Sequence, residues 1–170
     1  LNPLLRNFLL LKDYKPEAGA SLSHPHCQLN SMPIVPAEIV KELALSRIHF
    51  EEKLRCLMCD IITQELDSYK RIVLESENFV VLSPYASRFP GELLIAPVPE
   101  SHMHLFHNIP NELIKELAGI FVQALKKLKK FFEDPPFNWV LHTAPVRFNR
   151  KDHGETIEEA AENLRDVIRL

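Results

Sequence analysis

The sequence predicts an α+β fold in which helices cover an antiparallel sheet. Short apolar segments at 71–75, 79–82 and 93–96 follow one another closely along the chain, and short connections join antiparallel rather than parallel strands. Two longer segments, 36–55 and 110–131, carry apolar residues at roughly helical spacing. The 170 residues, of which 46% are hydrophobic, are enough for one domain with a buried core.

Two strands and a helix are predicted in the first third of the chain. Residues 8–12 form a short apolar run that ends at Asp13-Tyr14-Lys15-Pro16, which is typical of a buried strand. A loop then leads into a second strand, which contains a His-Pro-His sequence and is closed by Pro33. Pro36 is suited to begin the first helix, because proline is favoured in the first helical turn.

The later elements alternate between strands and helices. Ser76-Glu77-Asn78 has the turn chemistry of a hairpin between the strands at 71–75 and 79–82. Pro110 opens the helix with the clearest apolar periodicity, and residues 137–143 form a further strand. Thr156 can cap a closing helix. The inward-facing residues of this helix would be Ala160, Leu164, Val167 and Ile168.

Composition and charge argue against several classes of partner. Lys and Arg number 20 and Asp and Glu 23, a net charge of −3, so no basic excess indicates nucleic acid. No apolar run could span a bilayer, and no signal-peptide pattern opens the chain. Three cysteines, two of them in a CxxC, fit an intracellular metal site better than a disulfide framework. We expect a cytoplasmic protein that binds neither nucleic acid nor membrane.

The most distinctive segment is Gly19-Ala20-Ser21-Leu22-Ser23-His24-Pro25-His26-Cys27-Gln28. In an extended chain His24, His26 and Gln28 would point to one face, and Pro25 disfavours a helix here. The small residues before them let a phosphate-sized group approach the backbone, and the Ser21 hydroxyl adds a donor. The segment could therefore hold and attack a phosphoryl group. A metal-binding pair or a chance His-x-His is the alternative.

Written as Gly-Ala-Ser-x-x-His-Pro-His-x-Gln, this segment resembles the active-site signature of the galactose-1-phosphate uridylyltransferase family, a branch of the histidine-triad superfamily. Cys-x-x-Cys-Asp at 56–60, the run Phe89 to Pro97 and then His102 follow in the family's order. The resemblance implies a histidine-triad-like sheet in one domain over 1–170. It would have a signature strand in 17–33 and a zinc-binding second half in 56–170, and would be an abridged chain of the uridylyltransferase type.

The resemblance also implies a nucleotidyltransferase. In the family the second histidine of His-Pro-His forms a covalent nucleotidyl-histidine, while the main-chain carbonyl of the first holds its other ring nitrogen. Carried over, His26 would take a nucleotidyl group from a nucleoside diphosphate sugar, and a sugar 1-phosphate would accept it. In an ADP-glucose phosphorylase-like variant the acceptor would be phosphate.

Gln28 bears on the choice between transfer and hydrolysis. Hydrolytic histidine-triad relatives usually carry a third histidine at this position, which can protonate an alkoxide or help to activate water. Glutamine can do neither, and a phosphate leaving group needs no proton. Gln28 therefore favours a transferase over a histidine-triad hydrolase.

Four further residues are expected to bind substrate: Ser21, His24, Asp13 and His142. Ser21 matches a family serine that contacts the phosphates, with a turn hydroxyl as the alternative. His142 matches a segment beside the active site, with a hydrogen-bonded core residue as the alternative. Where this chain has Asp13 and Lys15, the family usually has Asn and Gly. A carboxylate at position 13 would repel phosphates unless Lys15 neutralises it.

Cys56 and Cys59 have the spacing of half a tetrahedral zinc site, although buried thiols and redox pairs share that spacing. The resemblance implies His102 as a third ligand, and His153 is a weak stand-in for the fourth. His104 and His107 are alternatives on the loop of His102. We expect zinc as the cofactor and a homodimer as the assembly. The non-enzymatic alternative is a zinc-stabilised nucleotide-binding or interaction module.

Overall fold

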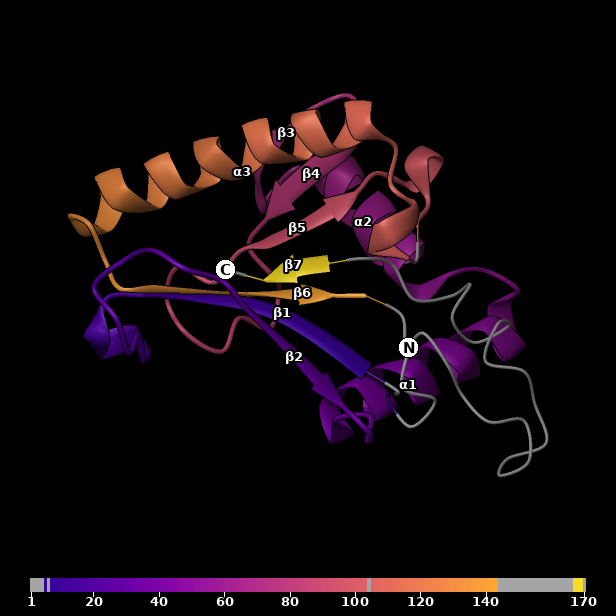
Figure 1. Cartoon of the computed structure of the whole chain (residues 1–170). Helices are drawn as coiled ribbons and strands as arrows, with labels where there is room; N and C mark the ends of the chain where they lie inside the picture. Colours follow the sequence, from indigo (N-terminus) through magenta and orange to yellow (C-terminus); the bar gives the residue numbers. More distant parts are fainter. Residues whose placement is uncertain (1–4, 6, 104, 144–166, 170) are drawn as a thin grey trace.

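The computed structural model describes residues 5, 7–103, 105–143 and 167–169, whose strands form one antiparallel seven-stranded sheet (Figure 1). The strand order is β2-β1-β6-β7-β5-β4-β3. The strands are β1 (Asn7–Tyr14), β2 (Gln28–Met32), β3 (Ile72–Glu75), β4 (Phe79–Leu82), β5 (Leu94–Pro97), β6 (Phe137–His142) and β7 (Val167–Arg169). The helices are α1 (Ala37–Lys53), α2 (Leu57–Ser68) and α3 (Asn111–Phe132), with 3-10 turns η1 (Pro16–Ala18), η2 (Pro99–Ser101) and η3 (Phe106–Asn108). The expected α+β fold is confirmed.

The β4–β5 part of the sheet is buried on both faces. Phe79 and Val81 pack with Leu117 and other residues of α3 in one core cluster, while Val80 and Leu82 pack around Ile62 of α2 in a second. Alternate residues of a strand point to opposite faces, so each strand here needs apolar residues at every position. This explains why 79–82 is a continuous apolar run.

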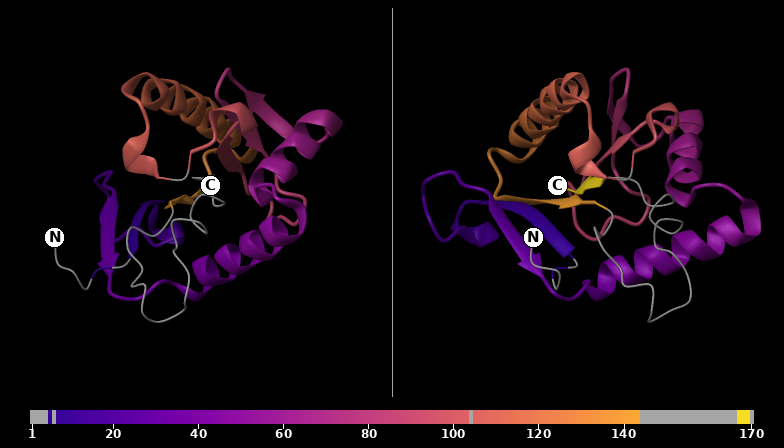
Figure 2. Two further views of the ribbon diagram at one scale, coloured as in Figure 1. Left: turned by 90° about the vertical axis from the view of Figure 1, so that its right-hand side faces the viewer. Right: turned by 45° about the vertical axis from the view of Figure 1, so that its right-hand side comes forward.

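Helices α3 and α1 lie on opposite sides of the sheet, as Figure 2 shows. On β6, Leu141 and Trp139 belong to the core cluster under α3. The alternate β6 residues, Asn138 and His142, must therefore lie on the face toward α1. Asp13 pairs with Asn138 in the β1–β6 ladder, and Gln28 pairs with Leu11 in the β1–β2 ladder. Asp13, Asn138 and Gln28 consequently share the α1 face.

Most predicted elements are confirmed, with boundaries that shift by a residue or two. The prediction that His-Pro-His forms a strand is wrong, because β2 begins only at Gln28. The 3-10 turn η1 and an irregular segment precede it. Pro25 has no N–H to contribute to a ladder, and β1 already turns away into η1 after Tyr14.

The predicted closing helix is also wrong at Val167 and Ile168, the two of its named residues that the structure describes. Val167 and Ile168 lie in β7, which pairs with β6 on one side and β5 on the other. Without β7, the facing edges of β5 and β6 would have unpaired backbone groups, and β-branched residues suit this position. Thr156, Ala160 and Leu164 lie outside the described residues.

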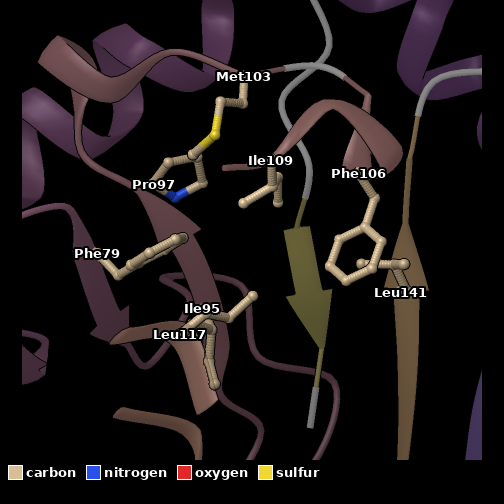
Figure 3. Close-up of a pocket in the computed structure, with 8 residues that line it drawn as sticks. All are labelled: Phe79, Ile95, Pro97, Met103, Phe106, Ile109, Leu117 and Leu141. Carbon is tan, nitrogen blue, oxygen red and sulfur yellow. The ribbon is translucent and has the colours of Figure 1, made fainter. Parts of the chain in front are cut away.

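A small apolar pocket lies between η3, α3 and the sheet (Figure 3). Its walls include Phe106, Leu117 and Leu141, and it has room for only about one water molecule. It is too small for a nucleotide, and none of the residues expected to bind substrate lines it.

Among the described helices, none combines the length and the hydrophobicity that a membrane span requires.

Glu116 of α3 holds the β3–β4 turn. Its carboxylate accepts hydrogen bonds from the Ser76 hydroxyl (2.6 Å), the Asn78 backbone N–H (2.8 Å) and the Asn78 side-chain amide (2.8 Å). Burial opposes ionisation of Glu116, but these bonds outweigh it and hold the pKa of the carboxyl below its ordinary value. Because the folded-state pKa is lowered, the stabilisation is present above that ordinary value and is lost as the pH falls through the folded-state pKa.

Glu116→Gln should therefore lower the free energy of unfolding at pH 7 by about 1–2 kcal/mol and by clearly less at pH 3. Urea unfolding at the two pH values measures the difference. Glu77→Gln, an exposed residue of the same turn, is the matched control and should change stability by less than about 0.5 kcal/mol. An equal loss from Glu116→Gln at both pH values would show that its charge is not involved.

Candidate active site and metal centre

The ring of His26 is held by the backbone of the segment that carries it. Nδ1 of His26 lies 2.9 Å from the main-chain oxygen of His24. A carbonyl oxygen can only accept, so Nδ1 carries a proton, and in the neutral ring Nε2 then has the lone pair. This confirms the expected contact between the two histidines. Nε2 is therefore the ring nitrogen of His26 that this contact leaves available.

His24 itself is exposed, and its ring Nδ1 lies 3.2 Å from the oxygen of Pro25. Its contribution to His26 comes from its main chain and not from its side chain. Ser21 is also exposed, in the loop between η1 and His24. These positions leave both side chains accessible to a bound phosphate, which is the role predicted for them.

Asp13 lies next to the end of β1 and receives hydrogen bonds from two amides. Gln28 Nε2 donates to its Oδ2 at 3.4 Å. Asn138 Nδ2 donates to its Oδ1 and also to the backbone oxygen of Ala18 in η1. Asn138 was not singled out in the sequence. Its role depends on the pairing of β6 with β1, which no local motif reveals.

Lys15 does not neutralise Asp13 by an ion pair in the structure. Its Nζ instead lies 2.9 Å from Asp134 Oδ2 and donates to the Asp134 backbone oxygen. The hydrogen bond to Asp134 raises the pKa of Lys15. Lys15 has φ 73° and ψ 154°, a region that is almost exclusive to glycine. The contacts with Asp134 therefore hold a strained lysine where the family usually has glycine.

His142 ends β6 and lies 3.3 Å from Glu42 of α1, measured from Nδ1 to Oε2. The side chains are only 16% and 26% exposed. This pair connects the sheet to α1 on the face that carries Asp13 and Gln28. His142 thus has a hydrogen-bond partner in the fold, and its contact with substrate stays a prediction.

Three metal-ligating side chains meet at the start of α2. The ligand atoms of Cys56, Cys59 and His102 all lie within 4.8 Å of one another, and Cys59 Sγ is 3.2 Å from His102 Nδ1. Tetrahedral zinc with Zn–S bonds near 2.3 Å places its ligand atoms about 3.8 Å apart, so the group fits a metal if the 3.2 Å pair separates slightly and no pair stays as far apart as 4.8 Å. His107 lies apart from this group in η3, and His104 and His153 lie outside the described residues.

The helix start favours thiolates in this group. Cys56 is the N-cap of α2 and Cys59 lies in its first turn, where the helix dipole stabilises negative charge. Burial opposes ionisation of Cys56, but hydrogen bonds with His102 and Cys59 outweigh it and hold the pKa of the thiol below its usual value. The donor set of two thiolates and an imidazole is one that zinc prefers.

Asp60, directly after Cys59, fixes the position of this helix start. Its carboxylate lies 2.9 Å from His49 Nε2 in α1 and 3.1 Å from Arg55 Nε. The hydrogen bond with His49 lowers the pKa of Asp60. No motif in the sequence singles out His49. The position of Asp60 directly after the CxxC is the feature of the sequence that could have indicated this contact.

Comparison with known proteins agrees with this geometry, although no family model matches the chain. The ADP-glucose phosphorylase of Arabidopsis thaliana is 33% identical over 81% of this chain and 37% of its own length. A galactose-1-phosphate uridylyltransferase of Thermotoga maritima is 34% identical over 80% of this chain and 41% of its own. Over about four fifths of its length the chain is thus similar to members of the galactose-1-phosphate uridylyltransferase family.

Solved structures from the same family share the fold. An Arabidopsis ADP-glucose phosphorylase with bound ADP-glucose matches with a TM-score of 0.84 and 27% identity, over 99% of this chain and 49% of that one. A uridylyltransferase matches with a TM-score of 0.83 over 98% of this chain. The histidine-triad-like sheet is therefore confirmed. The chain spans about two fifths of the length of these curated relatives and about half of the solved family structures.

The strain at Lys15 leads to a stability prediction. Lys15→Ala should lose the ion pair and keep the unfavourable backbone conformation, whereas Lys15→Gly loses the ion pair but relieves the strain. Lys15→Gly should therefore be more stable than Lys15→Ala by about 1 kcal/mol or more in chemical denaturation. In ordinary positions the order is reversed, because glycine is more flexible in the unfolded chain. An alanine variant as stable as the glycine variant would contradict the assigned strain.

Proposed function

We propose that the protein is a nucleotidyltransferase of the hexose-1-phosphate uridylyltransferase type that works through a nucleotidyl-histidine at His26. The observation that carries the proposal is the 2.9 Å contact between His26 Nδ1 and the His24 carbonyl. It holds the ring in the tautomer whose Nε2 can attack phosphorus. The similarity to galactose-1-phosphate uridylyltransferases supports the choice of substrate class.

The reaction would proceed in two displacements. First, Nε2 of His26 forms a bond to the α-phosphorus of a nucleoside diphosphate sugar, and the bond from that phosphorus to the bridging oxygen breaks to release the sugar 1-phosphate. Then a phosphate oxygen of a second sugar 1-phosphate attacks the same phosphorus, and the P–N bond breaks. The His24 carbonyl stabilises the positive charge that the nucleotidylated ring carries on its Nδ1–H side.

Gln28 suits both displacements because each leaving group departs without needing a proton. In the first, a phosphate oxygen leaves, and in the second, the imidazole leaves. An amide N–H can stabilise the charge on a phosphoryl oxygen without transferring a proton. The absence of an acid–base group at position 28 supports transfer over hydrolysis.

A second candidate is an ADP-glucose phosphorylase, in which inorganic phosphate takes the place of the second sugar phosphate. It is supported by the 33% identity to the Arabidopsis enzyme of that name. The two candidates share the first displacement and differ in nucleotide and acceptor. UDP-glucose and ADP-glucose, each tested with galactose 1-phosphate and with phosphate, distinguish them.

We further propose that Cys56, Cys59 and His102 bind a structural zinc ion. A zinc ion would bridge the start of α2 and the segment after η2, and would stabilise the fold rather than react. His153 as the fourth ligand, a homodimer and a cytoplasmic location stay predictions from the family resemblance.

His26→Gly should abolish covalent labelling by a radiolabelled nucleotide sugar, because it removes the attacking nitrogen. His24→Ala is the matched control: it keeps the main-chain carbonyl and should retain labelling within about tenfold of the wild-type rate. A phosphoramidate to histidine is labile in mild acid and stable in alkali, so the label should follow that pattern. Comparable labelling of His26→Gly would show that another residue is the nucleophile.

Gln28→His should shift the balance toward hydrolysis, because an acid–base group would stand next to the labelled histidine. The measurement is the rate at which the label is lost to water when no acceptor is present. We expect an increase of about tenfold or more over wild type. An unchanged rate would mean that residue 28 does not control the access of water to the intermediate.

Cys59→Ser should reduce bound zinc from about one equivalent to a small fraction, because thiolates dominate binding at such sites. Elemental analysis of the freshly purified, reduced protein measures this. The exposed Cys27, outside the ligand group, provides the control Cys27→Ser, which should keep its zinc. Wild-type protein without zinc would remove the proposal.

A further inference from the structure

Asn78, in the turn between β3 and β4, is hydrogen-bonded through its backbone and through both ends of its side-chain amide. Its backbone N–H and its Nδ2 each donate to the carboxylate of Glu116 at 2.8 Å. Its Oδ1 accepts from the Ser101 hydroxyl at 2.6 Å, and its backbone oxygen accepts from the Val98 N–H at 2.9 Å. Asn78 therefore links α3 to the segment that follows β5.

Glu116 determines which end of the Asn78 amide faces Ser101. A carboxylate has only acceptors, so the NH2 group of Asn78 must face Glu116. The amide oxygen is then left on the side of the Ser101 hydroxyl, which donates to it. The Ser101 hydroxyl thus meets an acceptor whose orientation is already fixed.

The segment that Asn78 holds leads directly to His102. Val98 is the N-cap of η2 and Ser101 is its last residue, and the Ser101 N–H donates to the Val98 oxygen at 3.0 Å. The side chain of Val98 is buried in the core cluster around Ile62 of α2. His102 is the next residue after η2 and is exposed. The segment, rather than burial of the ring, therefore determines where His102 lies.

The two sides of the metal-ligating group are held by different parts of the fold. Cys56 and Cys59 belong to the start of α2, where Asp60 bonds to α1 through His49. His102 comes instead from the segment after β5. Ligands that are held in place before a metal ion arrives lose less freedom when it binds, so the residues that support them raise the affinity.

We propose that Asn78 is a positioning residue for this group, which acts through Ser101 to hold His102 close to the two cysteines before zinc binds. The proposal rests on the zinc site proposed above. It extends that site by a chain of contacts that runs from Glu116 through Asn78 to Ser101. None of these three residues is itself a member of the ligand group.

Asn78→Ala tests the proposal, because it removes both side-chain contacts and keeps the two backbone bonds of residue 78. Its zinc dissociation constant should rise about tenfold or more, as is typical when support of a metal ligand is lost. Competition with a chelator of known affinity, in the reduced full chain, measures the constant. Asn108→Ala, the same substitution at an exposed site of η3, should stay within twofold of wild type.

Ser101→Ala separates this route from a general loss of stability. It removes only the hydroxyl that bonds to Asn78 Oδ1 and should also weaken zinc binding. In the Asn78→Ala background it should have no further effect, because the contact is already lost. A purely structural role of Asn78 would lower the stability of the fold and leave the zinc affinity of the folded protein unchanged.

Hydrogen exchange in the metal-free protein provides a readout that needs no zinc. The amides of Val98 and Ser101 should exchange faster in Asn78→Ala than in wild type and should not change in Asn108→Ala. Equal zinc affinities of Asn78→Ala and wild type, or additive losses in the double variant, would overturn the proposal. If wild type binds no zinc, the zinc site is what fails. Faster exchange would then still show that Asn78 holds the segment, and unchanged exchange would overturn both.

Discussion

The hydrogen bond from His26 Nδ1 to the His24 carbonyl is the interaction on which the proposed chemistry of this protein depends. An isolated imidazole in water exchanges between two tautomers, and only one of them presents Nε2 as a nucleophile. Here the acceptor lies two residues earlier in the same chain, with Pro25 between the two histidines. Because Pro25 restricts the backbone on both sides of itself, the segment itself orients the His26 ring.

The sheet has two parts that differ in how their faces are covered and in the polarity of their side chains. The β3–β4–β5 part is covered by α3 on one face and α2 on the other, and α2 begins next to the group of Cys56, Cys59 and His102. The β2–β1–β6 part carries polar side chains on its α1 face, where Asp13, Gln28 and Asn138 meet. The residues of the proposed chemistry thus lie on one face of the β2–β1–β6 part, and β7 joins the two parts by pairing with β5 and β6.

What the sequence predicted correctly was local. The strands at 71–75 and 79–82 each lie within a few consecutive residues, so periodicity suffices to find them, and the contact of His26 with the His24 carbonyl joins residues only two positions apart. The contacts of Asp13 with Asn138 and of Lys15 with Asp134 join residues 125 and 119 positions apart. No pattern within a short window encodes them. The same limit explains the error at Val167 and Ile168, whose partners in β5 and β6 are distant in sequence.

The tautomer of His26 tests the central claim most directly. Long-range 1H–15N correlation of histidine-labelled protein, compared with His26→Gly for assignment, identifies which ring nitrogen carries the proton when the ring is neutral. The structure predicts a protonated Nδ1 and an unprotonated Nε2 for His26, because the His24 carbonyl can only accept. A neutral ring protonated at Nε2 would contradict the account, since the nitrogen assigned to attack phosphorus would then have no lone pair to donate.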